Sequence, residues 1–238
     1  MQPSPASPSL NWSQRALLVF LAAAGLGLIG WSMARYWKKP EPGPAVVDIA
    51  QDVKDYLQKR NVRPLSEPLQ KILADESVPT VKTQAHPLLD HAAPDFDLVD
   101  SGKIAWKLTE ARKTGPVVLI FYYGYHCNHC VGQLFAINND LPLFKEMGAT
   151  VVAVSADPPE LTRERFKKYG AFAFPVVTDP GNKTAAAYGS VQPVKGKDDD
   201  VLHGTFIIDR QGIVRWANVG DEPFTDNRTL LRELAKLK

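Results

Sequence analysis

The segment Val117–Gln133 reads VVLIFYYGYHCNHCVGQ and contains the only two cysteines of this 238-residue chain. An apolar, β-rich run, Val117–Tyr123, precedes the cysteines and predicts a strand that is buried on both faces. Residues 128–146 then have the composition of a helix. Cys127 and Cys130 therefore stand where a buried strand gives way to the first turn of a helix.

The spacing of the two cysteines indicates redox chemistry. A CxxC sequence at a helix start brings both sulfur atoms within disulfide distance and exposes the first one. The free N–H groups and positive potential of a helix N-terminus favour the thiolate, which is the attacking species. His129 lies between the cysteines in sequence and is a candidate to stabilise that thiolate further. We therefore expect Cys127 and Cys130 to be catalytic, with no cofactor and no resident metal.

The residues alone leave three other uses of the cysteine pair open. A purely structural disulfide would close a very short loop and add little stability. A zinc site needs more ligands than one CxxC supplies, so the flanking histidines would have to complete it. Copper binding is the stronger rival, because soft thiolate ligands select Cu(I).

The rest of the second half alternates between strand and helix patterns. Predicted strands are Phe96–Val99, Thr150–Ser155, Pro175–Thr178, Thr205–Asp209 and Ile213–Asn218, and predicted helices are Pro159–Tyr169, Asn182–Tyr188 and Thr225–Lys238. Arg210-Gln211-Gly212 joins the last two strands as a hairpin turn, with glycine where a positive φ is needed. This order predicts an α/β, thioredoxin-like fold with a central mixed β-sheet flanked by helices.

An apolar run near the N-terminus gives a separate signal. Ala16–Trp37 reads ALLVFLAAAGLGLIGWSMARYW, with Arg35 as its only charge. At a rise of about 1.5 Å per residue, roughly 20 apolar residues cross the hydrocarbon core of a bilayer. Aromatic residues flank the run, as in the two interfacial belts. The sequence therefore predicts a transmembrane anchor over residues 14–37; a cleaved signal peptide is the alternative.

The anchor divides the chain into four predicted parts. Residues 1–13 are rich in proline and serine and predicted to be disordered, and residues 38–90 form a linker with short amphipathic helices. The redox domain then covers residues 91–238. Positive charges after the anchor favour a cytoplasmic domain, whereas anchored redox domains are commonly exported, so the side of the membrane stays open. The net charge of +2 gives no reason to expect nucleic acid as a partner.

Several segments of the second half resemble one known family. The segments are HAAPDFDLVDSGK (His91–Lys103), VVAVSADPPE (Val151–Glu160), FPVVTD (Phe174–Asp179) and HGTFIIDRQGIVRW (His203–Trp216), with the strand before the cysteines. They are similar to the AhpC/TSA peroxiredoxin-like redoxins, in the same order along the chain. The resemblance implies an antioxidant oxidoreductase that acts on a thiol, disulfide or peroxide substrate and is reset by an external dithiol.

The active-site pattern of that family is only partly present. Aligning its PxxxTxxC pattern on Cys130 puts Cys127 at the threonine position and Tyr123 at the proline position. The family's active-site arginine falls on His203, at the slot where thioredoxins carry a cis-proline. The peroxiredoxin pattern therefore assigns the nucleophile to Cys130 and the thioredoxin pattern assigns it to Cys127. In either frame we expect His203 to lie close to the CxxC.

These observations predict a membrane-anchored, two-cysteine oxidoreductase that catalyses thiol–disulfide exchange. Thiol-dependent peroxide reduction is a further activity that the sequence leaves open. The predicted catalytic residues are Cys127, Cys130, His203 and His129. The alternative function is a Cu(I)-binding chaperone that uses Cys127, Cys130 and His203. It rests on a resemblance of FYYGYHC (Phe121–Cys127) to the membrane-anchored SCO-type copper chaperones, although the cysteine spacing here is one residue shorter.

Overall fold

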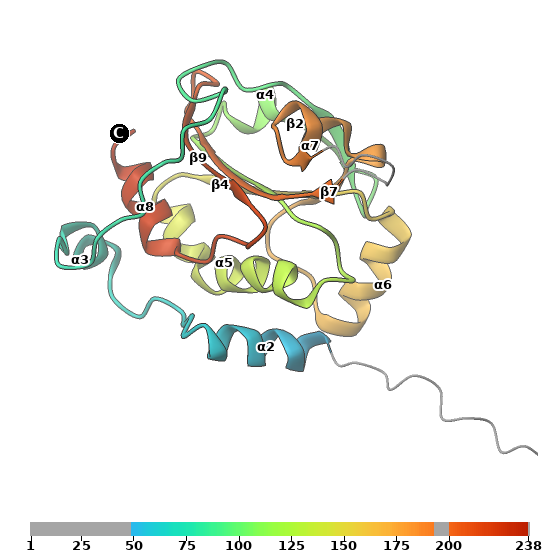
Figure 1. The fold of residues 1–238 in the computed structure, drawn as a ribbon, viewed down its shortest axis with the longest axis horizontal. Coiled ribbons are helices and arrows are strands. Elements are labelled where there is room, and N and C mark those ends of the chain that lie inside the picture. The colour runs from blue at the N-terminus through green and yellow to red at the C-terminus, as the bar shows by residue number, and fades with distance from the viewer. Residues whose placement is uncertain (1–48, 193–199, 238) are drawn as a thin grey trace, which may run out of the picture. The chain divides into compact units, whose positions relative to one another are not determined.

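The strand that leads to the cysteines is β3 (Val117–Phe121), and all of its side chains are buried. The computed structural model describes residues 49–192 and 200–237. In it, β3 belongs to a seven-stranded sheet with the order β2-β1-β5-β4-β3-β8-β9 (Figure 1). β3 pairs in parallel with β4 (Thr150–Ser155) and antiparallel with β8 (His203–Ile208). The sheet is therefore mixed, as the sequence predicts.

The remaining strands complete the two sides of this sheet and a small second one. They are β5 (Val176–Thr178), β1 (Asp97–Asp100) and β2 (Ala105–Lys107) on the β4 side, β9 (Val214–Gly220) beside β8, and the separate pair β6 (Val191–Gln192) and β7 (Asp200–Val201). β5 runs parallel to β4, whereas β1 is antiparallel to both of its neighbours. Parallel β3, β4 and β5 therefore end at the same edge of the sheet.

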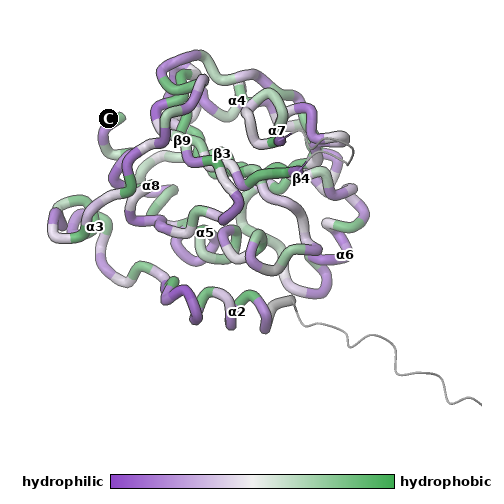
Figure 2. Tube along the Cα trace, viewed as in Figure 1, coloured by the Kyte–Doolittle hydropathy of each residue, from purple (hydrophilic) through white to green (hydrophobic). Residues whose placement is uncertain are grey.

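Helices cover both faces of the sheet, because successive side chains of each buried strand point to opposite sides. The helices on one face are α5 (Asn128–Glu146), α6 (Pro159–Tyr169) and α8 (Asn227–Ala235), and those on the other are α4 (Leu108–Ala111) and α7 (Lys183–Ala187). Val118 and Ile120 belong to the core under α5, whereas Val117, Leu119 and Phe121 belong to the core of the opposite face. Figure 2 shows the hydrophobic central strands between these layers.

Two helices lie in the part of the chain that the sequence predicts as a linker. α2 (Ile49–Lys59) lies along α5, and α3 (Leu69–Ala74) packs near α8 (Figure 1). Their apolar side chains are buried in the same core as those of α5; they include Val53, Leu69 and Ile72. The segment before residue 91 therefore contributes to the hydrophobic core of the redox domain.

Most predicted elements are present, and three of them, α5, β4 and α6, have the predicted bounds. The sequence did not reveal β2, α4 and the two-residue strands β6 and β7, which are too short to show a clear period. The predicted disordered segment and the predicted anchor lie outside the described residues. Within residues 49–192 and 200–237, no helix combines the length and the apolar character needed to cross a bilayer.

Candidate active site

Cys127 occupies the N-cap position of α5 and forms a disulfide with Cys130. The first backbone N–H groups of a helix have no partner within the helix, so a sulfur atom at this end lies in a region of positive potential. The two residues differ in exposure: Cys127 is partly exposed, whereas Cys130 is 1% exposed. After reduction, Cys127 is therefore the cysteine that an external substrate can reach.

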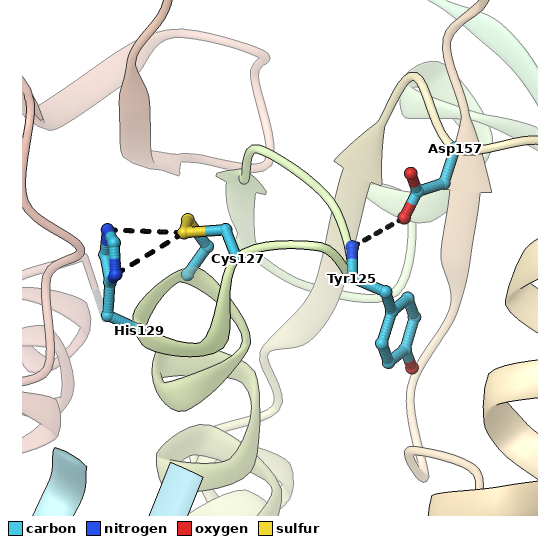
Figure 3. The surroundings of a disulfide bond; sticks show 5 residues. Tyr125, Cys127, His129 and Asp157 are labelled. Carbon is cyan, nitrogen blue, oxygen red and sulfur yellow. Dashed lines mark hydrogen bonds between the residues drawn. A yellow bond between two sulfur atoms is a disulfide. The ribbon is translucent and has the colours of Figure 1, made fainter. Parts of the chain in front are cut away.

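His129 lies directly beside the sulfur of Cys127. Its ring nitrogens Nε2 and Nδ1 are 3.2 Å and 3.5 Å from Cys127 Sγ (Figure 3). An N–H on the nearer nitrogen donates a hydrogen bond to the sulfur, and the same bond would stabilise a thiolate at that position. The imidazole is solvent-exposed.

The strand register brings His203 to the same place. Gly204 pairs with Phe121 across β8 and β3, which puts His203 beside the end of the strand that leads to the cysteines. The imidazole rings of His203 and His129 lie 6.0 Å apart, measured between centroids. Sulfur and nitrogen atoms of Cys127, Cys130, His129 and His203 all lie within 4.8 Å of one another. The four residues singled out from the sequence thus form one cluster.

His203 is a buried, neutral histidine. It is 5% exposed, and burial lowers the pKa of its imidazole to about 4. This value includes a smaller lowering by His129 and the opposing effects of Glu222 and Asp221, which raise the pKa. The Nδ1 atom of His203 is buried and has no hydrogen-bond partner in the described part of the chain. Near neutral pH the ring is therefore neutral and holds a buried polar atom without a partner among the described residues.

Helix α2 forms one wall of this site, a position that its sequence pattern does not predict. The ring of Tyr56 lies 5.9 Å from that of His129, and a Cβ atom on Gly132 would lie 2.8 Å from Tyr56 Cδ1. Arg60 lies 5.5 Å over the Tyr56 ring and forms an ion pair with Glu222 at 2.7 Å. An amphipathic pattern predicts that a helix packs on something, but it does not reveal which surface receives it.

His126, the other histidine of the CxxC segment, does not belong to this cluster. It is exposed, and its ring packs edge-on against that of Tyr123 at 4.8 Å. Asp157 is a site residue that was not predicted from the sequence, and its carboxylate accepts the backbone N–H of Tyr125 at 2.7 Å (Figure 3). A usable signal existed for Asp157: it follows β4, whose carboxyl end lies beside that of β3.

Comparison with known proteins identifies the family. Residues 89–217 match the AhpC/TSA family. The chain belongs to the AhpC/TSA family. This AhpC/TSA protein is therefore an oxidoreductase with a mixed α/β, thioredoxin-like fold. Helix α2, which carries Tyr56, lies outside the matched residues.

Relatives of two kinds are similar to this AhpC/TSA protein. Alkyl hydroperoxide reductase E of Mycobacterium tuberculosis is 31% identical over 129 residues, which cover 53% of this chain and 82% of the relative. Thiol-disulfide oxidoreductase ResA of Geobacillus thermodenitrificans is 32% identical over 123 residues, which cover 52% of this chain and 64% of the relative. The crystal structure of peroxidoxin BcpB from Mycobacterium tuberculosis superposes with a TM-score of 0.57 at 25% identity, covering 64% of this chain and 99% of the other.

Proposed function

We propose that this AhpC/TSA protein is a membrane-anchored thiol–disulfide oxidoreductase in which Cys127 attacks the substrate and Cys130 resolves the intermediate. The observation that carries the proposal is the difference between the two cysteines. Cys127 is partly exposed at the N-terminus of α5, whereas Cys130 is covered. An attacking sulfur needs access and a favoured thiolate, and Cys127 has both.

The exchange reaction follows from this order of attack. The Cys127 thiolate attacks one sulfur of a substrate disulfide, forms a mixed disulfide and releases the other substrate sulfur as a thiolate, which takes up a proton. Cys130 then loses its proton and attacks Cys127 Sγ, which releases the second substrate thiolate. The substrate gains two electrons and two protons, and the protein is left with the Cys127–Cys130 disulfide. An external dithiol restores the reduced pair.

The two histidines have different roles in the proposed cycle. The hydrogen bond from His129 to Cys127 Sγ favours the thiolate that attacks first. His203 is neutral near pH 7 and lies within 4.8 Å of both sulfurs, so a ring N–H can donate a hydrogen bond to the thiolate that forms when Cys130 loses its proton. A neutral histidine thus stands where thioredoxins carry proline.

Peroxide reduction is a second reaction that the same pair of cysteines could catalyse. The Cys127 thiolate would attack the O–O bond of a hydroperoxide, become a sulfenic acid and release the alcohol, and Cys130 would then form the disulfide and release water. The similarity to alkyl hydroperoxide reductase E supports this use. The residues at the proline, threonine and arginine positions of the peroxiredoxin pattern are Tyr123, Cys127 and His203, so the usual peroxide-binding groups are replaced. We therefore propose disulfide exchange as the main activity.

A turnover assay separates these two activities. The full-length chain in mild detergent is given dithiothreitol and either a model protein disulfide or tert-butyl hydroperoxide. The proposal predicts disulfide reduction that exceeds the uncatalysed rate and is lost in Cys127→Ser. Peroxide consumption at a comparable rate would make the protein a peroxidase, and no turnover with either substrate would refute an enzymatic role.

Copper(I) binding is a second candidate function, and one observation favours it. Four potential ligand atoms, from Cys127, Cys130, His129 and His203, converge within 4.8 Å, and thiolate and imidazole ligands suit Cu(I). Such an ion would be cargo held by the reduced pair and released on oxidation. Titration of the reduced chain with Cu(I) against bathocuproine disulfonate tests this candidate. One tightly held ion in a protein without turnover would favour the copper chaperone over the oxidoreductase.

The anchor over residues 14–37 rests on the apolar length of the run and on its aromatic flanks. Membranes from cells that express the full-length chain are washed with alkaline carbonate. The chain should remain in the membrane pellet, whereas a Leu21→Arg/Leu26→Arg variant should appear in the supernatant. Release of the unmodified chain would refute the anchor, and loss of the first residues from the mature protein would indicate a signal peptide.

A further inference from the structure

A buried carboxylate outside the CxxC contacts the turn that leads into Cys127. Asp157 follows β4 and is 8% exposed. Its Oδ2 atom accepts a hydrogen bond from the backbone N–H of Tyr125 at 2.7 Å (Figure 3). Tyr125 precedes Cys127 by two residues, so this bond fixes the backbone immediately before the nucleophile.

The turn and the carboxylate fit each other closely at Gly124. The φ of Gly124 is +116°, a conformation that side chains rarely adopt. A Cβ atom at this position would lie 2.6 Å and 2.9 Å from the two carboxylate oxygens of Asp157. Only glycine leaves room for the carboxylate, and the carboxylate in turn fills the space that glycine leaves.

The backbone that carries Asp157 is itself held in place. The N–H of Asp157 donates to Ser155 Oγ at 3.3 Å, and Thr178 Oγ1 donates to the carbonyl of Asp157 at 3.0 Å. Ser155 ends β4 and Thr178 ends β5, so these hydrogen bonds attach the backbone of Asp157 to the rigid edge of the sheet. The carboxylate therefore holds the turn before Cys127 in a fixed position relative to the sheet.

The other end of the same turn is the start of α5. The N–H of Cys127 donates to the carbonyl of Gly124 at 3.3 Å, and the carbonyl of Cys127 accepts the N–H of Val131 at 3.2 Å. Gly124, Tyr125 and Cys127 therefore form one short path from the carboxylate to the helix N-terminus. A change at Asp157 can move Cys127 Sγ relative to the N–H groups that stabilise its thiolate.

We propose that Asp157 is a positioning residue for Cys127: its carboxylate clamps the Gly124–Tyr125 turn and so holds Cys127 Sγ at the N-terminus of α5. The inference rests on the proposed function, in which Cys127 attacks first. It adds a residue of a different strand–helix connection to the CxxC machinery. Tyr125 and Tyr122 on the turn side, His126, and Arg165 of α6 are the titratable groups that face this carboxylate.

The negative charge of the Asp157 carboxylate and its hydrogen bond to the turn have opposite effects on the stability of the Cys127 thiolate. Burial raises the pKa of Asp157, while the Tyr125 N–H, His126 and Arg165 lower it. A nearby negative charge disfavours a thiolate at Cys127, whereas the clamp favours it through the helix N-terminus. Two variants separate these effects, because asparagine keeps an oxygen acceptor without the charge and alanine removes both.

The test compares Asp157→Asn with Asp157→Ala in the reduced full-length chain. Iodoacetamide alkylation is followed over pH, and mass spectrometry locates the label. We expect Asp157→Ala to alkylate Cys127 about fivefold or more slowly than Asp157→Asn near pH 7, with the midpoint of its pH profile shifted upward. Equal rates and equal midpoints in the two variants would overturn the proposal. Label on Cys130 instead of Cys127 in the unmodified chain would refute the order of attack, which is a separate failure.

Asp140 provides a matched control for a buried carboxylate. It is 3% exposed, burial raises its pKa, and its Oδ1 accepts the backbone N–H of Leu65 at 2.8 Å. Asp140→Asn and Asp140→Ala should alkylate Cys127 at the same rate. If Asp157→Ala does not fold, hydrogen exchange of the Tyr125 amide in the unmodified chain and in Asp157→Asn still tests the clamp. Fast exchange of that amide in the unmodified chain would overturn it.

Discussion

The imidazole rings of His129 and His203 lie 6.0 Å apart, one exposed and one buried, beside the Cys127–Cys130 disulfide. The two rings come from elements far apart in sequence, the first turn of α5 and the first residue of β8. Burial keeps His203 neutral near pH 7. We expect His129 to favour the attacking thiolate at Cys127 and His203 to stabilise the thiolate of the resolving Cys130.

Replacing His129 by alanine should slow the attack by Cys127. Its ring nitrogen lies 3.2 Å from Cys127 Sγ, and losing a partly exposed hydrogen bond to a thiolate costs about 1 kcal/mol. We therefore expect roughly fivefold slower alkylation of the reduced chain near pH 7. His91→Ala is the control, because that exposed imidazole bonds only to its own loop through the carbonyl of Leu89. Equal rates for the unmodified chain and His129→Ala would exclude this role.

Acid should destabilise the oxidised protein through His203. Its pKa is lowered from 6.5 to about 4 in the fold, so the folded state binds fewer protons than the unfolded state between these values. Stability is therefore lost as the pH falls through this window, by about 3 kcal/mol in total. Urea unfolding of the unmodified chain and of His203→Gln at pH 7 and pH 4 measures the difference. An identical pH dependence in the two proteins would contradict a buried neutral His203.

Enlarging Gly132 should separate α2 from the active-site helix. A Cβ atom at this position would lie 2.8 Å from Tyr56 Cδ1, so Gly132→Ala overpacks the contact. We expect a loss of about 1–2 kcal/mol, net of the gain in helix propensity. Gly220→Ala is a control, since no atom lies within 4 Å of a Cβ there. Adding Tyr56→Ala should reduce the cost of Gly132→Ala, and a strictly additive double variant would argue against the contact.

The sequence predicts the central part of this fold well, because the relevant signals are local. The apolar runs of β3 and β4 and the charged, amphipathic pattern of α6 mark these elements without any tertiary information. The position of His203 could also be predicted, because the thioredoxin-like order brings the start of that strand to the end of β3.

The missed parts of the site depend on contacts between distant segments. Tyr56 reaches His129 because α2 packs against α5 at Gly132, and no local pattern encodes that contact. Asp157 reaches Tyr125 because the parallel strands β3 and β4 end at one edge. The difference in solvent exposure between Cys127 and Cys130 likewise cannot be predicted from the CxxC sequence, because it depends on how the packed structure covers Cys130.

The order of attack is the central claim, and trapping the mixed disulfide tests it most directly. The reduced full-length Cys130→Ser and Cys127→Ser variants are each incubated with a model disulfide, and the adducts are located by mass spectrometry. We predict rapid formation of a stable adduct on Cys127 in Cys130→Ser and little adduct on Cys130 in Cys127→Ser, because Cys130 is 1% exposed. Faster trapping through Cys130 than through Cys127 would contradict the account.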